Sequence, residues 1–120
     1  MIMDKKQALK IINDGETMRI EEIPKILWED KEVVLAAVKL DGMFLFYASD
    51  KLIKNKEIVL AAVKTSGLAI QYADESLKKD INICCEAIKQ DDCAYDHISD
   101  EIKKDPTILK TWSDSINAHK

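Results

Sequence analysis

A stretch of eleven residues occurs twice in this chain, as EVVLAAVKLDG from Glu32 and as EIVLAAVKTSG from Glu57. The two copies lie 25 residues apart, and the same phase continues without a gap to Asp80 and Asp105. A fixed period of this length is typical of repeat proteins, in which each unit buries its apolar face by stacking on its neighbours. The repeat therefore predicts a stacked array.

Each unit is predicted to begin with an α-helix. The units open with Asp or Asn, whose side chains accept hydrogen bonds from the free N–H groups of a first helical turn. The residues that follow are almost entirely apolar, as in VVLAAV from Val33, which indicates a helix buried on several sides. The four predicted caps are Asp30, Asn55, Asp80 and Asp105.

A second, shorter helix is predicted after a glycine in the two clearest copies. Gly42 and Gly67 are expected to end the first helix in the left-handed conformation, which glycine adopts without steric cost. The apolar segments MFLFYA from Met43 and LAIQYA from Leu68 then follow. Equivalent positions in successive units indicate three core columns: Leu45, Ile70 and Tyr95; Tyr47, Tyr72 and His97; Leu52, Leu77 and Ile102.

The same phase reaches both ends of the chain. Residues 4–29 form a degenerate first unit, whose helix matches the next at 26 rather than 25 residues, so its first loop should differ. Units 30–54, 55–79 and 80–104 follow, and residues 105–120 are predicted to form a C-terminal capping helix with a polar outer face. We therefore predict a single all-α domain of short two-helix repeats, stacked as a compact, solenoid-like array.

The clearest copies resemble a known family of short helical repeats found in bacterial and protist proteins and catalogued as a domain of unknown function. The resemblance rests on VLAAVK, a glycine and Tyr-Ala, as in DKEVVLAAVKLDGMFLFYAS from Asp30 and NKEIVLAAVKTSGLAIQYAD from Asn55. The third copy, DINICCEAIKQDDCAYDHIS from Asp80, has Asp92 in place of the glycine and His97 in place of the tyrosine. The resemblance implies a helical array and brings no activity, cofactor or site residue.

Charge and hydropathy argue against two classes of partner. The net charge is −4 with both signs scattered, so no large positive field gathers phosphates, and nucleic acid is a disfavoured partner. No apolar run approaches the ~20 residues that span a bilayer, and the N-terminus lacks a signal-peptide stretch. We expect a cytoplasmic protein that does not contact membranes. Nucleic-acid contact remains an alternative through two lysine columns: Lys39, Lys64 and Lys89, and Lys54, Lys79 and Lys104.

Cysteine and histidine form one cluster with metal-ligand character near the end of the chain. Cys93 and His97 are four residues apart and would share one face of an α-helix, so a small metal- or thiol-dependent enzyme is the alternative function. The repeat favours a structural role, because Cys84, Cys85 and Cys93 stand in columns that Val, Leu and Met occupy elsewhere. We therefore predict no catalytic residue, no metal site and no cofactor.

One unit has more apolar residues than the repeat requires. Leu40, Phe46 and Ile53 occupy columns that are polar in the following copies, and Trp28 shares the column of Ile53. These residues either pack against the irregular first unit or form an exposed patch, and such patches often mark interaction sites. We predict that Trp28, Leu40, Phe46 and Ile53 bind a partner, and that Phe46 is the most exposed of them.

The leading functional prediction is a non-catalytic helical-repeat module for protein–protein interaction. In so small a chain, such a module would act as an inhibitor or effector that occludes a larger protein or assembly. The expected partner is another protein, with self-association as a second option.

Overall fold

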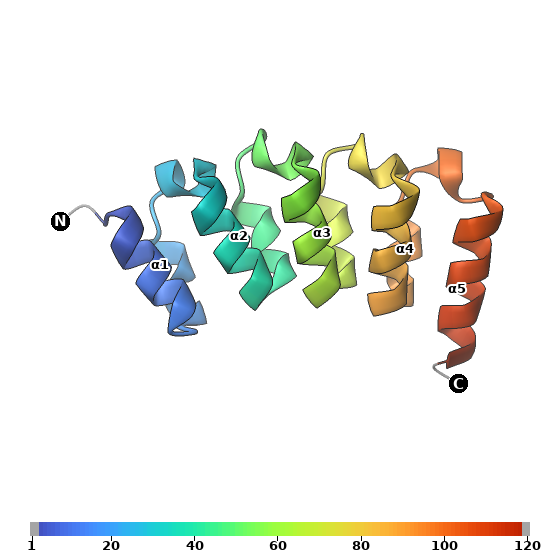
Figure 1. Ribbon diagram of the computed structural model, residues 1–120, viewed down its shortest axis with the longest axis horizontal. Helices are drawn as coiled ribbons and strands as arrows, with labels where there is room; N and C mark the ends of the chain where they lie inside the picture. The colour runs from blue at the N-terminus through green and yellow to red at the C-terminus, as the bar shows by residue number, and fades with distance from the viewer. Residues whose placement is uncertain (1–2, 119–120) are drawn as a thin grey trace.

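The computed structural model of the protein describes residues 3–118. Its five described α-helices stand side by side along the longest dimension of the molecule (Figure 1). They are α1 (Lys5–Asn13), α2 (Lys31–Leu40), α3 (Lys56–Thr65), α4 (Ile81–Gln90) and α5 (Pro106–Ala118). No β-strand occurs in this described part of the chain, so the predicted all-α repeat array is confirmed.

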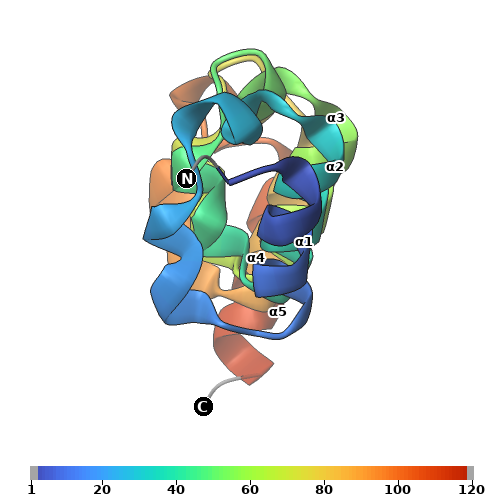
Figure 2. The same ribbon diagram turned by 90° about the vertical axis from the view of Figure 1, so that its left-hand side faces the viewer.

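Short 3₁₀ helices complete each repeat. Two 3₁₀ helices follow each of α1 to α4. The first of each pair occupies the position of the predicted second helix, which is therefore a 3₁₀ helix in every unit. The longer ones form a second layer behind the α-helices, as the end-on view shows (Figure 2). In chain order they are η1 (Thr17–Glu22), η2 (Lys25–Glu29), η3 (Gly42–Tyr47), η4 (Leu52–Lys54), η5 (Gly67–Tyr72), η6 (Leu77–Lys79), η7 (Asp92–His97) and η8 (Asp100–Ile102).

The molecule is an elongated slab of 52 × 29 × 17 Å, because each element packs against its counterparts in the neighbouring repeats. The core lies between the two layers and runs the length of the stack. Its largest fully buried side chains come mostly from the inner faces of the α-helices, which explains the near-identical apolar hexapeptides. They include Val33, Val34, Val38, Ile58, Val59, Val63, Ile83 and Ile88.

The predicted N-caps are confirmed at all four repeat starts. The backbone N–H groups of Val33, Ile58, Ile83 and Ile108 donate to the side chains of Asp30, Asn55, Asp80 and Asp105 at 3.2, 3.1, 3.0 and 3.3 Å, respectively. Burial acts to raise the pKa of Asp80, but the N–H of Ile83 and the ammonium of Lys56 hold it below its usual value. Lys56 reaches this cap from the preceding repeat, at 3.0 Å.

The role predicted for Gly42 and Gly67 is wrong. Neither glycine has a positive φ, and α2 ends at Leu40, followed by the C-cap residue Asp41 in an extended conformation with a φ of −155°. Gly42 lies against the carbonyl of Ala62 in α3, at a distance that no Cβ atom could tolerate. Gly67 lies in the same way against Ala87 in α4. These positions require glycine because the next repeat approaches so closely.

The first loop differs from the others, as predicted. Gly15 has a φ of +73° and ends α1 in the left-handed conformation. Its N–H donates to the carbonyl of Ile12 at 3.0 Å, and the N–H of Glu16 donates to that of Ile11 at 3.1 Å, which is a Schellman cap. Because η1 and η3 begin 25 residues apart, the additional residue of the first repeat lies in this loop.

One backbone hydrogen bond recurs at each junction between repeats on the 3₁₀ side. It connects the N–H that follows the longer 3₁₀ helix with a carbonyl near the end of the preceding repeat. The pairs are Ser49 to Trp28 at 3.1 Å, Asp74 to Ile53 at 3.1 Å and Ser99 to Lys78 at 3.0 Å. This regular bond holds neighbouring repeats in a single register.

Candidate functional site

The structure exposes two of the four predicted partner-binding residues. The exposed fraction is 64% for Phe46 and 41% for Leu40, and Phe46 is the most exposed of the four, as predicted. Trp28 is only 3% exposed and Ile53 is half-buried against the core. The prediction for Trp28 needs correction, because this ring stacks on Tyr47 at a centroid distance of 5.1 Å and cannot make a broad contact with a partner.

Phe46 lies at the centre of a group of rings on the 3₁₀ layer. Its ring meets Tyr47 edge-to-face at a centroid distance of 5.4 Å, and meets Tyr72 of the next repeat at 5.3 Å. Edge-to-face pairs are favourable because the positive ring edge meets the negative ring face. These contacts hold Phe46 in place although most of it faces solvent. We name Phe46, Tyr47 and Tyr72 the aromatic surface.

An open cleft of about 610 Å³ adjoins the aromatic surface at Tyr47. It lies between η2 and the turn that follows η3, and its volume is within the range of known small-ligand sites. Two cations and two carboxylates line it, so the cleft has no strong charge preference. Its lining consists of Lys25, Trp28, Glu29, Tyr47, Ala48, Ser49, Asp50 and Lys51.

Comparison with protein families places the chain in a group without an assigned activity. The model described as Domain of unknown function (DUF4116) matches the chain twice, over residues 4–53 and 55–103, which is more than half of its length. The chain belongs to this family. The predicted resemblance is therefore confirmed, and each DUF4116 match covers two of the 25-residue repeats. No match was found among curated proteins or among solved structures.

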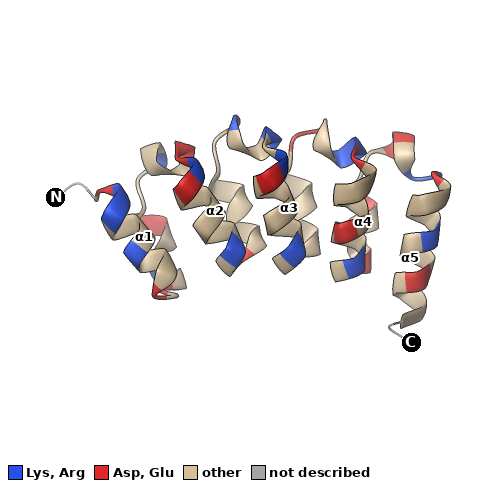
Figure 3. Cartoon of the chain, in the orientation of Figure 1, with Lys and Arg blue, Asp and Glu red and all other residues tan. Residues whose placement is uncertain are grey.

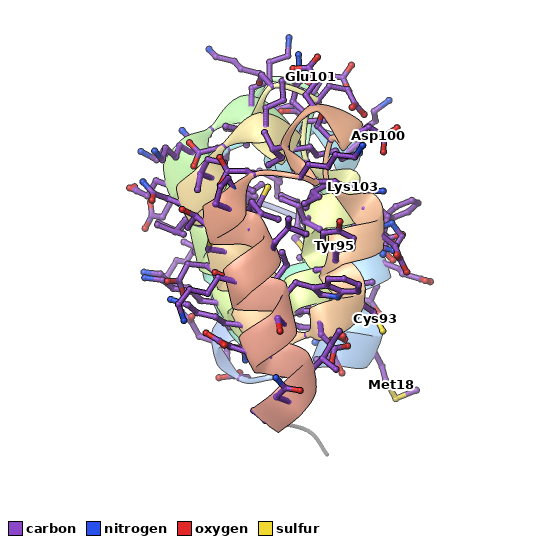
Figure 4. The ribbon with its side chains drawn as sticks, turned by 90° about the vertical axis from the view of Figure 1, so that its right-hand side faces the viewer. Met18, Cys93, Tyr95, Asp100, Glu101 and Lys103 are labelled. Carbon is purple, nitrogen blue, oxygen red and sulfur yellow. The ribbon has the colours of Figure 1, made fainter. Side chains whose placement is uncertain are left out.

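The three cysteines of this DUF4116 chain have different surroundings. Cys84 and Cys85 are buried, in agreement with their apolar columns, whereas Cys93 and His97 are exposed, contrary to the core role predicted for them. Both exposed residues belong to η7, which has no further 3₁₀ helix stacked on its outer side within residues 3–118 (Figure 4).

The geometry of η7 also weakens the case for a site that combines Cys93 with His97. A 3₁₀ helix has three residues per turn, so residues four apart point about 120° away from each other. The predicted shared face would need an α-helix. Cys93 instead lies beside two carboxylates, and one ligand atom each from Asp91, Asp92 and Cys93 fall within 4.8 Å of one another. These groups are at the surface, where acidic clusters are common without an ion.

Neither Cys84 nor Cys93 is an activated thiol. The carboxylate of Asp91 raises the pKa of Cys93, and burial raises the pKa of Cys84 to about 12. A nucleophilic cysteine needs the opposite shift, because the thiolate is the reactive form.

The lysine columns of this DUF4116 chain lie on a surface of mixed charge. Lys39, Lys64 and Lys89 are exposed near the C-terminal ends of α2, α3 and α4, where a cation complements the helix dipole (Figure 3). Lys89 lies 3.9 Å from Glu86, and Lys79 pairs with Glu101 of the next repeat at 3.4 Å. On α2 and α3, the acidic residues lie near the N-terminal end and the lysines near the C-terminal end, so both signs occur on the same helices (Figure 3).

The C-terminal end carries an aromatic pair that the repeat pattern did not predict. Tyr95 stacks on Trp112 of α5 at a centroid distance of 4.2 Å, and its hydroxyl donates to the carbonyl of Lys103 at 2.9 Å (Figure 4). Lys103 follows Trp28, Ile53 and Lys78 in the carbonyl series that joins the repeats, and its carbonyl accepts from the Tyr95 hydroxyl instead of from a backbone N–H. The available signal was Trp112, which stands in the column of Ala62 and Ala87.

A strongly exposed methionine was also missed. Met18 in η1 is 95% exposed and projects from the stack (Figure 4). It shares a column with Met43 and Leu68, which are half-buried, so the repeat alone suggested a covered position.

None of the helices within residues 3–118 is long and apolar enough to cross a membrane.

Proposed function

We propose that the protein is a non-catalytic module that binds another protein through the aromatic surface. The observation that carries this proposal is the exposure of Phe46 in a column where every other repeat has a polar residue. The equivalent residues are Glu21, Gln71 and Asp96. The fold does not need an aromatic ring here, because three of its four repeats do without one.

The surroundings of Phe46 suit a binding contact. Aromatic residues are enriched among the side chains that dominate binding energy, and a ring that is held in place before binding loses little entropy. Tyr47 and Tyr72 hold Phe46 from two sides, and the adjoining cleft offers space for a side chain of the partner.

The size of the stack is compatible with an occluding role. A standard interface buries roughly 800 Å² on each partner. The 52 × 29 Å face of the slab exceeds this area, so one face can cover a substantial part of a larger protein. An inhibitor or effector role is part of the proposal, and these dimensions are compatible with it. The thiol-enzyme alternative has less support, since the pKa of Cys93 is raised.

Affinity capture from a native lysate tests the role of Phe46. The tagged wild-type protein is compared with Phe46→Gln, which introduces the residue that the next repeat has at Gln71. We expect this variant to remain folded, at a cost of about 1 kcal/mol for the lost ring contacts. Loss of a hot-spot side chain lowers affinity by roughly tenfold or more, so the partner should disappear from the captured fraction.

Leu109→Gln serves as the matched control. Leu109 is an exposed apolar residue of α5, on the other layer of the stack, so its replacement should leave capture unchanged. Circular dichroism establishes that both variants are folded. Equal retention of all partners by wild type and Phe46→Gln would refute the role of the aromatic surface. Sedimentation of the wild type alone measures self-association.

A further inference from the structure

Charge on the 3₁₀ layer is divided between its middle and its ends. The central helices η3 and η5, GMFLFY and GLAIQY, have no charged residue. The outer helices are acidic: η1 carries Glu21 and Glu22, and η7 carries Asp92 and Asp96 before His97. Figure 3 shows the uncharged middle of this layer behind α2 and α3. The aromatic surface therefore lies between two acidic regions.

Two carboxylates of these regions are free to meet a partner. Glu21 and Asp96 are exposed, they share the column of Phe46, and neither forms an ion pair within residues 3–118. The one arginine of η1 does not offset them, because Arg19 is already paired with Glu16 at 3.1 Å and with Glu22 at 3.0 Å. The lysines of this layer lie in its shorter 3₁₀ helices and turns. Lys25 and Lys51, which line the cleft beside Tyr47, share it with the carboxylates of Glu29 and Asp50.

The spacing of the repeats determines how far these groups are from Phe46. Packed helices lie roughly 8–10 Å apart, so Glu21 is about 10 Å to one side of Phe46, and Asp96 is about 20 Å to the other side. An extended peptide rises about 3.3 Å per residue. These distances correspond to roughly three and six residues of a peptide that runs along the stack.

We propose that the partner presents an extended, basic segment to the aromatic surface, and this rests on the protein-binding function proposed above. An apolar or arginine side chain of the segment packs on Phe46, and lysine or arginine residues about three positions to one side and six to the other meet Glu21 and Asp96. Aromatic faces attract cations, so an arginine suits the central position as well. The same carboxylates repel phosphate-rich partners and a second copy of this acidic chain, whose net charge is −4.

Selection from a random peptide library tests the charge preference directly, because it does not require an identified partner. Peptides of about twelve residues span roughly 40 Å when extended, which is enough to reach both carboxylates. The library is displayed on phage, selected on the wild-type protein and depleted on Phe46→Gln. Binding of the selected peptides is then measured by fluorescence anisotropy with wild type, with Phe46→Gln and with the double variant Glu21→Gln/Asp96→Asn.

We expect the selected peptides to be enriched in lysine and arginine on both sides of an anchor. Their affinity for Glu21→Gln/Asp96→Asn should fall roughly threefold to tenfold, because each exposed charge pair contributes modestly. The wild-type affinity should also weaken as the salt concentration rises from about 20 to about 300 mM, and the double variant should show less of this dependence.

The other outcomes separate the two proposals. Peptides that require Phe46 but show no basic enrichment, or bind the double variant as tightly as the wild type, would overturn the basic partner and leave the protein-binding function intact. A selection that yields no peptide, or only peptides that bind Phe46→Gln equally well, would overturn both. Both variants replace exposed side chains with neutral polar ones, and circular dichroism establishes that they are folded.

Discussion

The close contact at Gly42 predicts that Gly42→Ala destabilises the protein, whereas the same substitution in open space would stabilise it. Gly42 has an ordinary negative φ, so Gly42→Ala with open space around it would stabilise the protein by about 0.4–1 kcal/mol, through the lower entropy of the unfolded chain. The added Cβ would instead meet the carbonyl oxygen of Ala62, with the carbonyl carbon at 2.8 Å and the hydroxyl oxygen of Thr65 at 2.9 Å. Two of these three atoms are backbone and cannot rotate away.

The repeats on either side must therefore separate to admit the methyl group. Overpacking of a well-packed interface costs about 1–3 kcal/mol, and a clash with backbone belongs at the upper end of this range. Separation also strains the hydrogen bond from the Thr65 hydroxyl to the carbonyl of Val38, now 3.0 Å, whose loss costs about 1 kcal/mol. We expect Gly42→Ala to destabilise the protein by about 3 kcal/mol and to lower Tm by roughly 10 °C.

Urea denaturation followed by circular dichroism measures this free energy. Gly15→Ala is the control, because nothing lies within 4 Å of its added Cβ and only the φ of +73° is unfavourable. That conformation costs an alanine about 1–2 kcal/mol, so Gly15→Ala should be the milder change. Gly67→Ala should behave like Gly42→Ala. If Gly42→Ala is as stable as the wild type or more stable, close approach of the repeats does not explain this glycine.

Two further predictions concern titrating groups. The pKa of Asp80 is held below its usual value, so its stabilising effect is present above the unfolded-state pKa of about 3.9 and is lost as the pH falls through the folded-state pKa. Asp80→Asn keeps a capping oxygen, as Asn55 does, and should lose less stability than the wild type below about pH 4 in urea titrations; equal acid-induced losses would contradict this. Titration with a coloured disulfide reagent should modify the exposed Cys93 first in the folded protein, because Cys84 and Cys85 are buried and should react only slowly or after unfolding. A second thiol that reacts as fast as Cys93 would show that the core is more open than described.

The architecture was predictable because its signals are local and repeated. A cap such as Asp30 acts within three residues of itself, and four copies of the same signal leave little ambiguity about where the helices begin. The role of Gly42 was not predictable in this way, because it depends on Ala62 in the next repeat and on how closely two helices approach. The 3₁₀ form of the second helices depends in the same way on packing between the layers.

The candidate site was predictable in part. Columns that change from polar to apolar identified Phe46, and its exposure agrees with that signal. The same signal failed for Trp28, because a column comparison cannot tell that the ring has a partner in Tyr47. The pairing of Tyr95 with Trp112 was not predicted for a related reason. A repeat pattern describes the contacts that all units share, and Trp112 stands where the earlier units have alanine.

The close contacts of Gly42 and Gly67 restrict how such a gene can lengthen by duplication. Copying residues 55–79 in tandem would create only junctions of the kind already present, with a glycine facing an alanine carbonyl. Copying residues 80–104 would press the side chain of Asp92 against the helix of the inserted unit, because Ala87 would occupy the facing position. Duplication of residues 55–79 is therefore compatible with the close packing of the repeats, and duplication of residues 80–104 is not.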